Sequence, residues 1–185
     1  HYHFEYVNLW PRPYQKPHPP IWCPSLGSVE TIEWAAHPDR KYVYLQNYSP
    51  IQSVLRYLNM YREVCERQYG YKAASTQIGW TAPVYVGETD EKAVAEAGRH
   101  MEVLFNKLLA LPFEMLFPPG YLSFRSYKNL LAHKRSITGG VTIEQLMGQG
   151  IVIVGSPDTV RKKILATHRE VGFENFVALL HFATL

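Results

Sequence analysis

The sequence lacks the features that mark several common classes of protein. It contains no apolar run of about 18 residues, the length that a membrane-spanning helix requires. It has 19 Lys and Arg against 16 Asp and Glu, and the net charge of +3 comes without a dense basic run. Since nucleic-acid binding usually needs a basic stripe, we expect neither a nucleic-acid partner nor a membrane partner.

Cysteine is scarce, and the motifs of two large enzyme classes are missing. Cys23 and Cys65 are far apart and share no metal-ligand spacing, so we expect reduced thiols in a cytoplasmic protein. The eight histidines include no His-x-x-x-His pair, which argues against a metal site. The absence of a Gly-x-Ser-x-Gly motif argues against an α/β-hydrolase.

What the sequence does contain is a regular alternation of short apolar segments and amphipathic ones. Apolar residues make up 46% of the chain and charged residues 19%, enough for one sizeable core. This alternation predicts a parallel sheet with right-handed helical crossovers, an α/β fold. We expect four parallel strands, with helices after the first three, near residues 20–24, 41–46, 77–86 and 175–181.

The two ends of the chain carry further local signals. Residues 4–10 alternate and are rich in aromatics, which predicts a strand, and the prolines between residues 11 and 20 predict an extended loop. Near the other end, Ser156 is placed to cap a helix that Gly172 ends. Residues 176–180 are continuously apolar, which predicts a buried strand.

A small polar turn follows the first predicted strand and precedes the first predicted helix. It contains Ser25, Gly27, Ser28 and Thr31. Unpaired N–H groups and the positive dipole end at a helix start favour an anion, so this turn is a candidate phosphate site. The structural alternative is that Ser28 is simply the N-cap of the helix. The turn alone leaves both interpretations open.

Several blocks of the chain together resemble the flavin-dependent, luciferase-like monooxygenases. They are the proline-rich residues 11–22, the turn followed by Glu33-Trp34-Ala35-Ala36, and two later blocks at residues 152–160 and 172–176. The resemblance implies a (β/α)8 barrel, called a TIM barrel, that binds reduced FMN or, in some branches, a deazaflavin. It also implies that Ser25, Gly27, Ser28 and Thr31 hold the cofactor's phosphate.

The resemblance implies that the flavin performs the oxygen chemistry with O2 on a small organic substrate. The protein then positions the cofactor and excludes water, so no catalytic acid or base is required in this chain. Trp22, Cys23 and Trp80 lie on predicted strands where they are candidates to flank the flavin ring. Packing in the core is the alternative for all three residues.

Length sets this chain apart from the family it resembles. A complete barrel of this type needs about 250 residues, and this chain has 185. The matching blocks correspond to strands five to eight, so we interpret residues 1–185 as a single C-terminal half-barrel with an insertion, a lid, at residues 111–150. A half-barrel leaves strand edges open, which predicts a homodimer or association with a missing N-terminal half. The alternative function is a non-catalytic half-barrel scaffold that oligomerises and binds no flavin.

Overall fold

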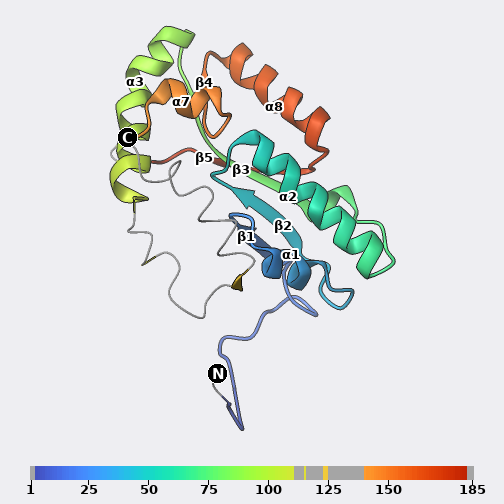
Figure 1. Cartoon of the computed structure of the whole chain (residues 1–185). Coiled ribbons are helices and arrows are strands. Elements are labelled where there is room, and N and C mark those ends of the chain that lie inside the picture. The colour runs from blue at the N-terminus through green and yellow to red at the C-terminus, as the bar shows by residue number, and fades with distance from the viewer. Residues whose placement is uncertain (1–2, 111–114, 116–122, 125–139, 183–185) are drawn as a thin grey trace.

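The computed structural model describes residues 3–110, 115, 123–124 and 140–182 of the chain. Within these residues the fold is a parallel α/β sheet with helices packed against it (Figure 1). The β-α alternation of the sequence is therefore confirmed as the organising pattern. The strands are β1 (Trp22–Ser25), β2 (Val43–Asn47), β3 (Ile78–Val86), β4 (Ile153–Gly155) and β5 (Asn175–Leu179).

The nine-residue strand β3 is the centre of the sheet. β1 pairs with β2, β2 pairs with the first half of β3, and every pairing is parallel. β5 pairs with residues 79–83 of β3, and β4 pairs with the last three residues of β3. The four predicted strands are confirmed, and the short β4 is one that the prediction missed.

Among the described α-helices, all but Ile51–Glu63 begin at a capping residue that the sequence places there. Ser28, Thr89, Thr142 and Ser156 each accept a backbone N–H bond at a helix start, which satisfies a group that would otherwise lack a partner. Two helices extend into a π-helical turn, at Val64–Gln68 and Leu104–Leu108. The helices are α1 (Val29–Ala36), α2 (Ile51–Glu63), α3 (Asp90–Val103), α7 (Ile143–Gly148) and α8 (Pro157–Val171).

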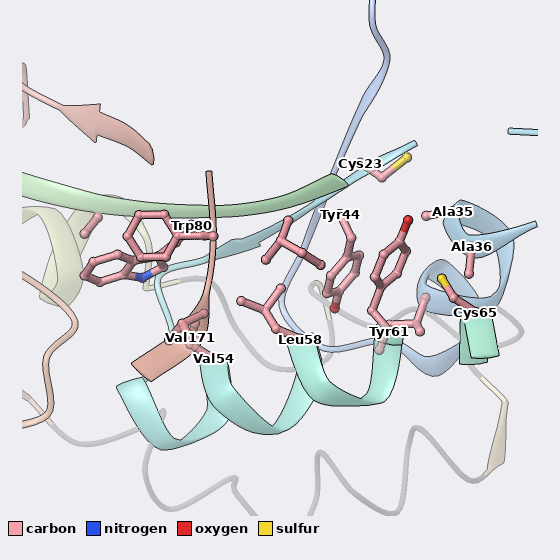
Figure 2. Close-up of a cluster of buried hydrophobic side chains, with 14 of the residues drawn as sticks. Cys23, Ala35, Ala36, Tyr44, Val54, Leu58, Tyr61, Cys65, Trp80 and Val171 are labelled. Carbon is pink, nitrogen blue, oxygen red and sulfur yellow. The ribbon is translucent and has the colours of Figure 1, made fainter. Parts of the chain in front are cut away.

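The main core lies between one face of the sheet and helices α1, α2 and α8 (Figure 2). Tyr44 of β2 stacks on Tyr61 of α2 with ring centroids 5.4 Å apart, and Leu58 is buried beside them. Burial of one such Leu side chain stabilises the fold by about 2 kcal/mol. A second cluster joins α3, α7 and β4. In the part of the chain that is described, no helix has the length and apolar content needed to cross a membrane.

Three features differ from the prediction. Residues 4–10 form no strand, because an extended segment needs a partner strand and none pairs with it among the described residues. β5 is not fully buried: Val177 is 37% exposed, because it is the register partner of Thr81 and so lies on the sheet face away from α1, α2 and α8. β4 was missed because three residues are too few to show a strand period. Most of residues 111–150 lies outside the described residues.

Candidate functional site

The carboxyl ends of the strands bring several polar residues to one edge of the sheet. Ser25 is the last residue of β1 and lies opposite Gln46 in β2, while Asn47, the last residue of β2, lies opposite Thr81 in β3. In parallel α/β sheets and barrels this is the edge where ligands bind. The candidate site therefore lies at this edge.

The four residues of the predicted phosphate turn lie together in the structure. The N–H groups of Gly27 and Ser28 donate to Ser25 Oγ at 3.0 and 3.3 Å, and the N–H of Thr31 donates to Ser28 Oγ at 3.3 Å. Ser28 is therefore the N-cap of α1, so the structural interpretation of this residue is confirmed. Its role toward a phosphate stays a prediction.

The backbone of this turn favours Gly27, and its packing adds a close approach to Tyr57. Its φ is +111°, and a Cβ atom at this position would overlap the aromatic ring of Tyr57 in α2. The guanidinium of Arg56 lies 4.7 Å from the Tyr57 ring centroid and donates to the Tyr57 hydroxyl at 2.9 Å. Arg56 thus brings a positive charge toward the turn, while the Ser28 hydroxyl donates to the Glu30 carboxylate at 2.8 Å.

The two faces of the sheet have different roles. Tyr44 and Trp80 point toward the helices, where Trp80 packs against Phe173 (Figure 2). A Cβ on Gly79 would meet the Leu45 side chain, so these two residues share the opposite face. Because side chains alternate along a strand, Asn47 and Thr81, each two residues further on, also lie on that opposite face. A closed barrel would have this face as its interior.

Asn47 and Thr81 each hold a buried polar atom without a partner. Within the described part of the chain, Asn47 Oδ1 and Thr81 Oγ1 are the buried side-chain oxygen atoms that make no hydrogen bond. Thr81 is only 7% exposed. Such atoms in a native protein call for an explanation, and a ligand with polar ring groups is one. The residues present therefore fit a flavin, which carries both N–H and carbonyl groups.

A chain of buried hydrogen bonds holds the end of β2 beside this pair. The Tyr44 hydroxyl donates to Gln46 Oε1 at 3.1 Å, and Gln46 Nε2 donates to Ser49 Oγ at 2.9 Å. The Ser49 hydroxyl in turn donates to the backbone oxygen of Asn47 at 2.9 Å. Burial raises the pKa of Tyr44 well above its ordinary value, so its phenol stays neutral and keeps donating.

The other candidates from the sequence are placed differently. Cys23 and Trp80 are part of the main core, which confirms core packing for both. Trp22 is 37% exposed. Asn47 and Thr81 were missed; Thr81 is a polar residue between the apolar Trp80 and Ala82, and that is the signal that was available, whereas Asn47 follows the polar Gln46 and carries no such signal. Among the residues described, no group of three His, Cys, Asp or Glu side chains could hold a metal ion.

A cavity of about 260 Å³ lies away from this pair, between α2, α7, β4 and α8. Trp80 lines it, which places it on the helix-covered side of the sheet. Lys163 and Glu170 of α8 also line it. Because Asn47 and Thr81 face the opposite side, the cavity is separate from the candidate site.

A second helix start at the same edge is filled by the protein's own carboxylate. Gly155 ends β4 opposite Val86, and Ser156 caps α8. Asp90 of α3 accepts the Ser156 N–H at 2.6 Å and the Thr159 hydroxyl at 2.9 Å. These hydrogen bonds, first of all the one from the Ser156 backbone, lower the pKa of Asp90 below its ordinary value.

Comparison with solved structures identifies the fold. The monooxygenase RslO1 from Streptomyces bottropensis matches with a TM-score of 0.60 and 20% identity, over 94% of this chain and 44% of its own. The oxygenating constituent of 3,6-diketocamphane monooxygenase from the CAM plasmid of Pseudomonas putida, solved in complex with FMN, matches with a TM-score of 0.54 and 19% identity, over 87% and 41%.

A third solved structure is the coenzyme F420-dependent tetrahydromethanopterin reductase from Methanopyrus kandleri. Its TM-score is 0.51 at 13% identity, over 85% of this chain and 44% of its own. This chain thus spans less than half the length of each of these three proteins. It is similar to part of their TIM-barrel-like fold, as the sequence predicted.

The search among curated proteins gave no match. The family model described as luciferase-like monooxygenase matches residues 1–175, which is nearly the whole chain. The chain belongs to the luciferase-like monooxygenase family.

Proposed function

We propose that this chain is part of a flavin-dependent monooxygenase that oxidises a small organic substrate with O2 and reduced flavin. The observation that carries the proposal is the family match over residues 1–175. The polar turn and the unpartnered pair, both at the carboxyl edge of the sheet, support it, because this is the edge where such folds bind ligands. When bound, the flavin supplies the oxygen chemistry.

The turn at the start of α1 is the proposed seat of the flavin phosphate. The hydroxyls of Ser28 and Thr31 and the backbone N–H groups that begin the helix supply donors, and the helix dipole favours a negative charge there. Gly27 lets the chain turn tightly under Tyr57, and Arg56 adds a positive charge nearby. To release the N–H groups of Gly27 and Ser28, the Ser25 hydroxyl must turn away from them.

The flavin is FMN or a deazaflavin in this proposal. The solved structures that share the fold name both FMN and coenzyme F420, which supports a flavin-type cofactor in general. FMN is our first choice, because the families of monooxygenases that this chain resembles use reduced FMN. We place the protein in the cytoplasm, where the free, buried Cys23 and Cys65 would stay reduced.

The arrangement of the chain in a complete barrel is also proposed. Residues 1–185 act as one C-terminal half-barrel unit, within which residues 111–150 stay a predicted insertion. β5 has one edge without a partner among the described strands, and Leu180 beyond it is 71% exposed. A second copy, or a separate chain that supplies the other half, would cover this edge.

One observation favours the alternative, a scaffold that binds no flavin. The donors of the α1 turn are already bonded within the protein, to Ser25 Oγ and Ser28 Oγ. The Glu30 carboxylate also lies on the Ser28 hydroxyl, where it opposes a second negative group. In this alternative the turn is a cap and the half-barrel acts through association alone.

Titration of the purified chain with FMN and with riboflavin, followed by flavin fluorescence, tests the proposal. We expect quenching by both flavins and tighter binding of FMN, because riboflavin lacks the phosphate. If the folded chain binds neither flavin at any protein concentration, the result would favour the scaffold that binds no flavin. Light scattering during size-exclusion chromatography measures the assembly in the same sample, and a concentration-independent monomer would contradict the half-barrel association.

A further inference from the structure

We propose that Asn47 and Thr81 form a hydrogen-bonding site for the imide edge of the flavin ring. The inference rests on the proposed function and adds to it, because it places the ring on the barrel-interior face of β2 and β3. The phosphate turn lies at the end of β1, one strand away from Asn47. The cofactor would then lie across the carboxyl ends of three neighbouring strands.

The two buried oxygen atoms without partners destabilise the free protein. Nearly all buried polar atoms in native proteins have a hydrogen-bond partner, and an unmade bond costs about 1–3 kcal/mol. In the described part of the chain, Asn47 Oδ1 and Thr81 Oγ1 are buried and unbonded. The two residues lie next to each other. This is unexpected for two independent packing defects and is expected for one ligand site.

The geometry of the pair suits one planar ligand. Asn47 and Thr81 are register partners in neighbouring parallel strands, which are about 4.8 Å apart. Their side chains lie on the same face of the sheet, on the side away from α1, α2 and α8. One edge of a planar ligand is therefore long enough to meet both oxygen atoms at once.

The chemistry of the two oxygen atoms indicates which ligand edge they bind. A carboxamide oxygen accepts hydrogen bonds and cannot donate them, whereas a threonine hydroxyl does both. The ligand edge must therefore present a donor to Asn47, and an N–H group next to a carbonyl group satisfies both residues at once. Phosphate and carboxylate groups carry no such donor. The dione end of a flavin ring carries an imide N–H between two carbonyls, so Asn47 accepts from the imide and Thr81 donates to the adjacent oxygen.

The backbone holds both positions rigidly. The buried Ser49 donates to the backbone oxygen of Asn47 and is itself held by Gln46. Thr81 lies in the middle of the sheet, where β3 pairs with β2 on one side and with β5 on the other. Sites on such fixed backbone hold a ligand more exactly than sites on loops.

The first test needs no ligand. Thr81→Val replaces an unpartnered hydroxyl with a methyl group of the same size, so we expect the Tm of the free protein to rise by about 3 °C. Thr159→Val is the matched control, because that hydroxyl donates to Asp90, and we expect its Tm to fall. A fall in Tm for Thr81→Val would show that the hydroxyl has a partner in the free protein and would overturn the proposal.

The second test measures binding of lumiflavin, which has the ring without the phosphate chain. We expect Thr81→Val to weaken binding about tenfold, Thr81→Ser to restore it, and Thr159→Val to leave it unchanged. In the unmodified protein, 3-methyllumiflavin should bind about tenfold more weakly than lumiflavin, because its imide N–H is blocked. Asn47→Leu should abolish this difference.

The outcomes separate this inference from the proposed function. If the unmodified protein binds lumiflavin and FMN but neither variant changes lumiflavin affinity, the imide site is wrong and the flavin function stands. If lumiflavin and its 3-methyl derivative bind equally well, the imide assignment is also overturned. If no flavin binds the unmodified protein, the proposed function fails together with the site.

Discussion

The starts of helices α1 and α8 are built on the same local pattern and differ in what fills them. Each has a serine as N-cap and a threonine three residues later: Ser28 and Thr31 in α1, Ser156 and Thr159 in α8. The N–H of the threonine donates to the serine Oγ at 3.3 Å in α1 and at 3.4 Å in α8. Each follows a strand at the carboxyl edge of the sheet.

The neighbours of the two helix starts decide their different roles. At α8, the Asp90 carboxylate from α3 takes the backbone N–H of Ser156 and the hydroxyl of Thr159, so a negative charge is already in place. At α1, the corresponding acceptor is the neutral Ser25 hydroxyl, and Arg56 lies close by. At α1 the Glu30 carboxylate lies on the Ser28 hydroxyl, whereas the Ser28 backbone N–H meets a neutral acceptor. We therefore expect α1 rather than α8 to take an anion, with Glu30 opposing it.

The largest expected effect comes from filling the space that Gly27 leaves under Tyr57. Gly27→Ala places a Cβ into the Tyr57 ring at a φ of +111°, so we expect a loss of about 3 kcal/mol in the free energy of unfolding. Urea denaturation followed by tryptophan fluorescence measures this. Gly70→Ala is the control, because Gly70 also has a positive φ but no atom within 4 Å of its Cβ position.

Gly70→Ala should cost about 1 kcal/mol, from backbone strain alone. Gly27→Ala together with Tyr57→Ala should lose less stability than the sum of the two single variants, because the overlap disappears. If the double variant is strictly additive, Tyr57 does not explain Gly27, and the α1 turn owes its shape to something else.

The next effect concerns the carboxylate that fills the α8 start. Asp90→Asn should lower the Tm by a few degrees at pH 7, because the amide accepts more weakly from Ser156 and Thr159. The pKa of Asp90 is lowered in the folded protein, so its stabilisation is present above the ordinary value of 3.8 and is lost as the pH falls through the lower folded value.

Thermal melts between pH 7 and pH 2 test this sign. The difference in Tm between the unmodified protein and Asp90→Asn should be constant at neutral pH and close only below pH 3.8. A difference that closes near pH 6 would mean that another group titrates there and that Asp90 is not the anion at α8. Glu91→Gln, at the exposed acidic residue next to Asp90 in the first turn of α3, serves as the control.

Local sequence patterns predict the order of the strands and helices. They do not predict which distant residues contact the ends of these elements. The capping residues Ser28 and Ser156, the helix stop at Gly172 and the four longer strands follow from local patterns, so they could be predicted. Asp90 lies 66 residues before Ser156, and a contact over that distance carries no local signal. The two helix starts therefore looked alike until the fold placed Asp90 beside one of them.

The same limit applies to the candidate site. Ser25, Gly27, Ser28 and Thr31 are close in sequence, so a local pattern was enough to group them. Asn47 and Thr81 become neighbours only through the register of β2 and β3. Their lack of hydrogen bonds is a property of the packed structure, which no composition or spacing reveals.

A smaller effect, on binding, compares the two helix starts directly. We expect Ser28→Ala with Thr31→Ala to weaken FMN binding about tenfold, because two donors to the phosphate are lost. The matched pair Ser156→Ala with Thr159→Ala should leave FMN binding unchanged. Both pairs lose an N-cap worth about 1 kcal/mol. The α8 pair should lose more stability than the α1 pair, because the Thr159 hydroxyl also donates to Asp90. Isothermal titration calorimetry with FMN, at a temperature roughly 20 °C below the Tm of each variant, keeps all variants folded.

Riboflavin separates a local effect from a general one in the same experiment. Since riboflavin has no phosphate, its affinity should be equal in the unmodified protein and in both double variants. If Ser28→Ala with Thr31→Ala binds FMN as tightly as the unmodified protein, the α1 turn is a cap and no more. If the α8 pair weakens FMN as well, the contrast between the two helix starts is wrong.

The smallest effect is expected at Glu30, the acidic residue that accepts from the Ser28 hydroxyl. Glu30→Gln removes a negative charge beside the proposed phosphate seat, so FMN should bind about two- to threefold more tightly at low salt. The gain should disappear at high salt, because an exposed charge is screened, and riboflavin should show no gain at any salt concentration. The helix itself should lose about 0.5 kcal/mol, because an acidic first turn complements the dipole. Unchanged FMN affinity at low salt would place the phosphate outside the reach of Glu30, and therefore away from the start of α1.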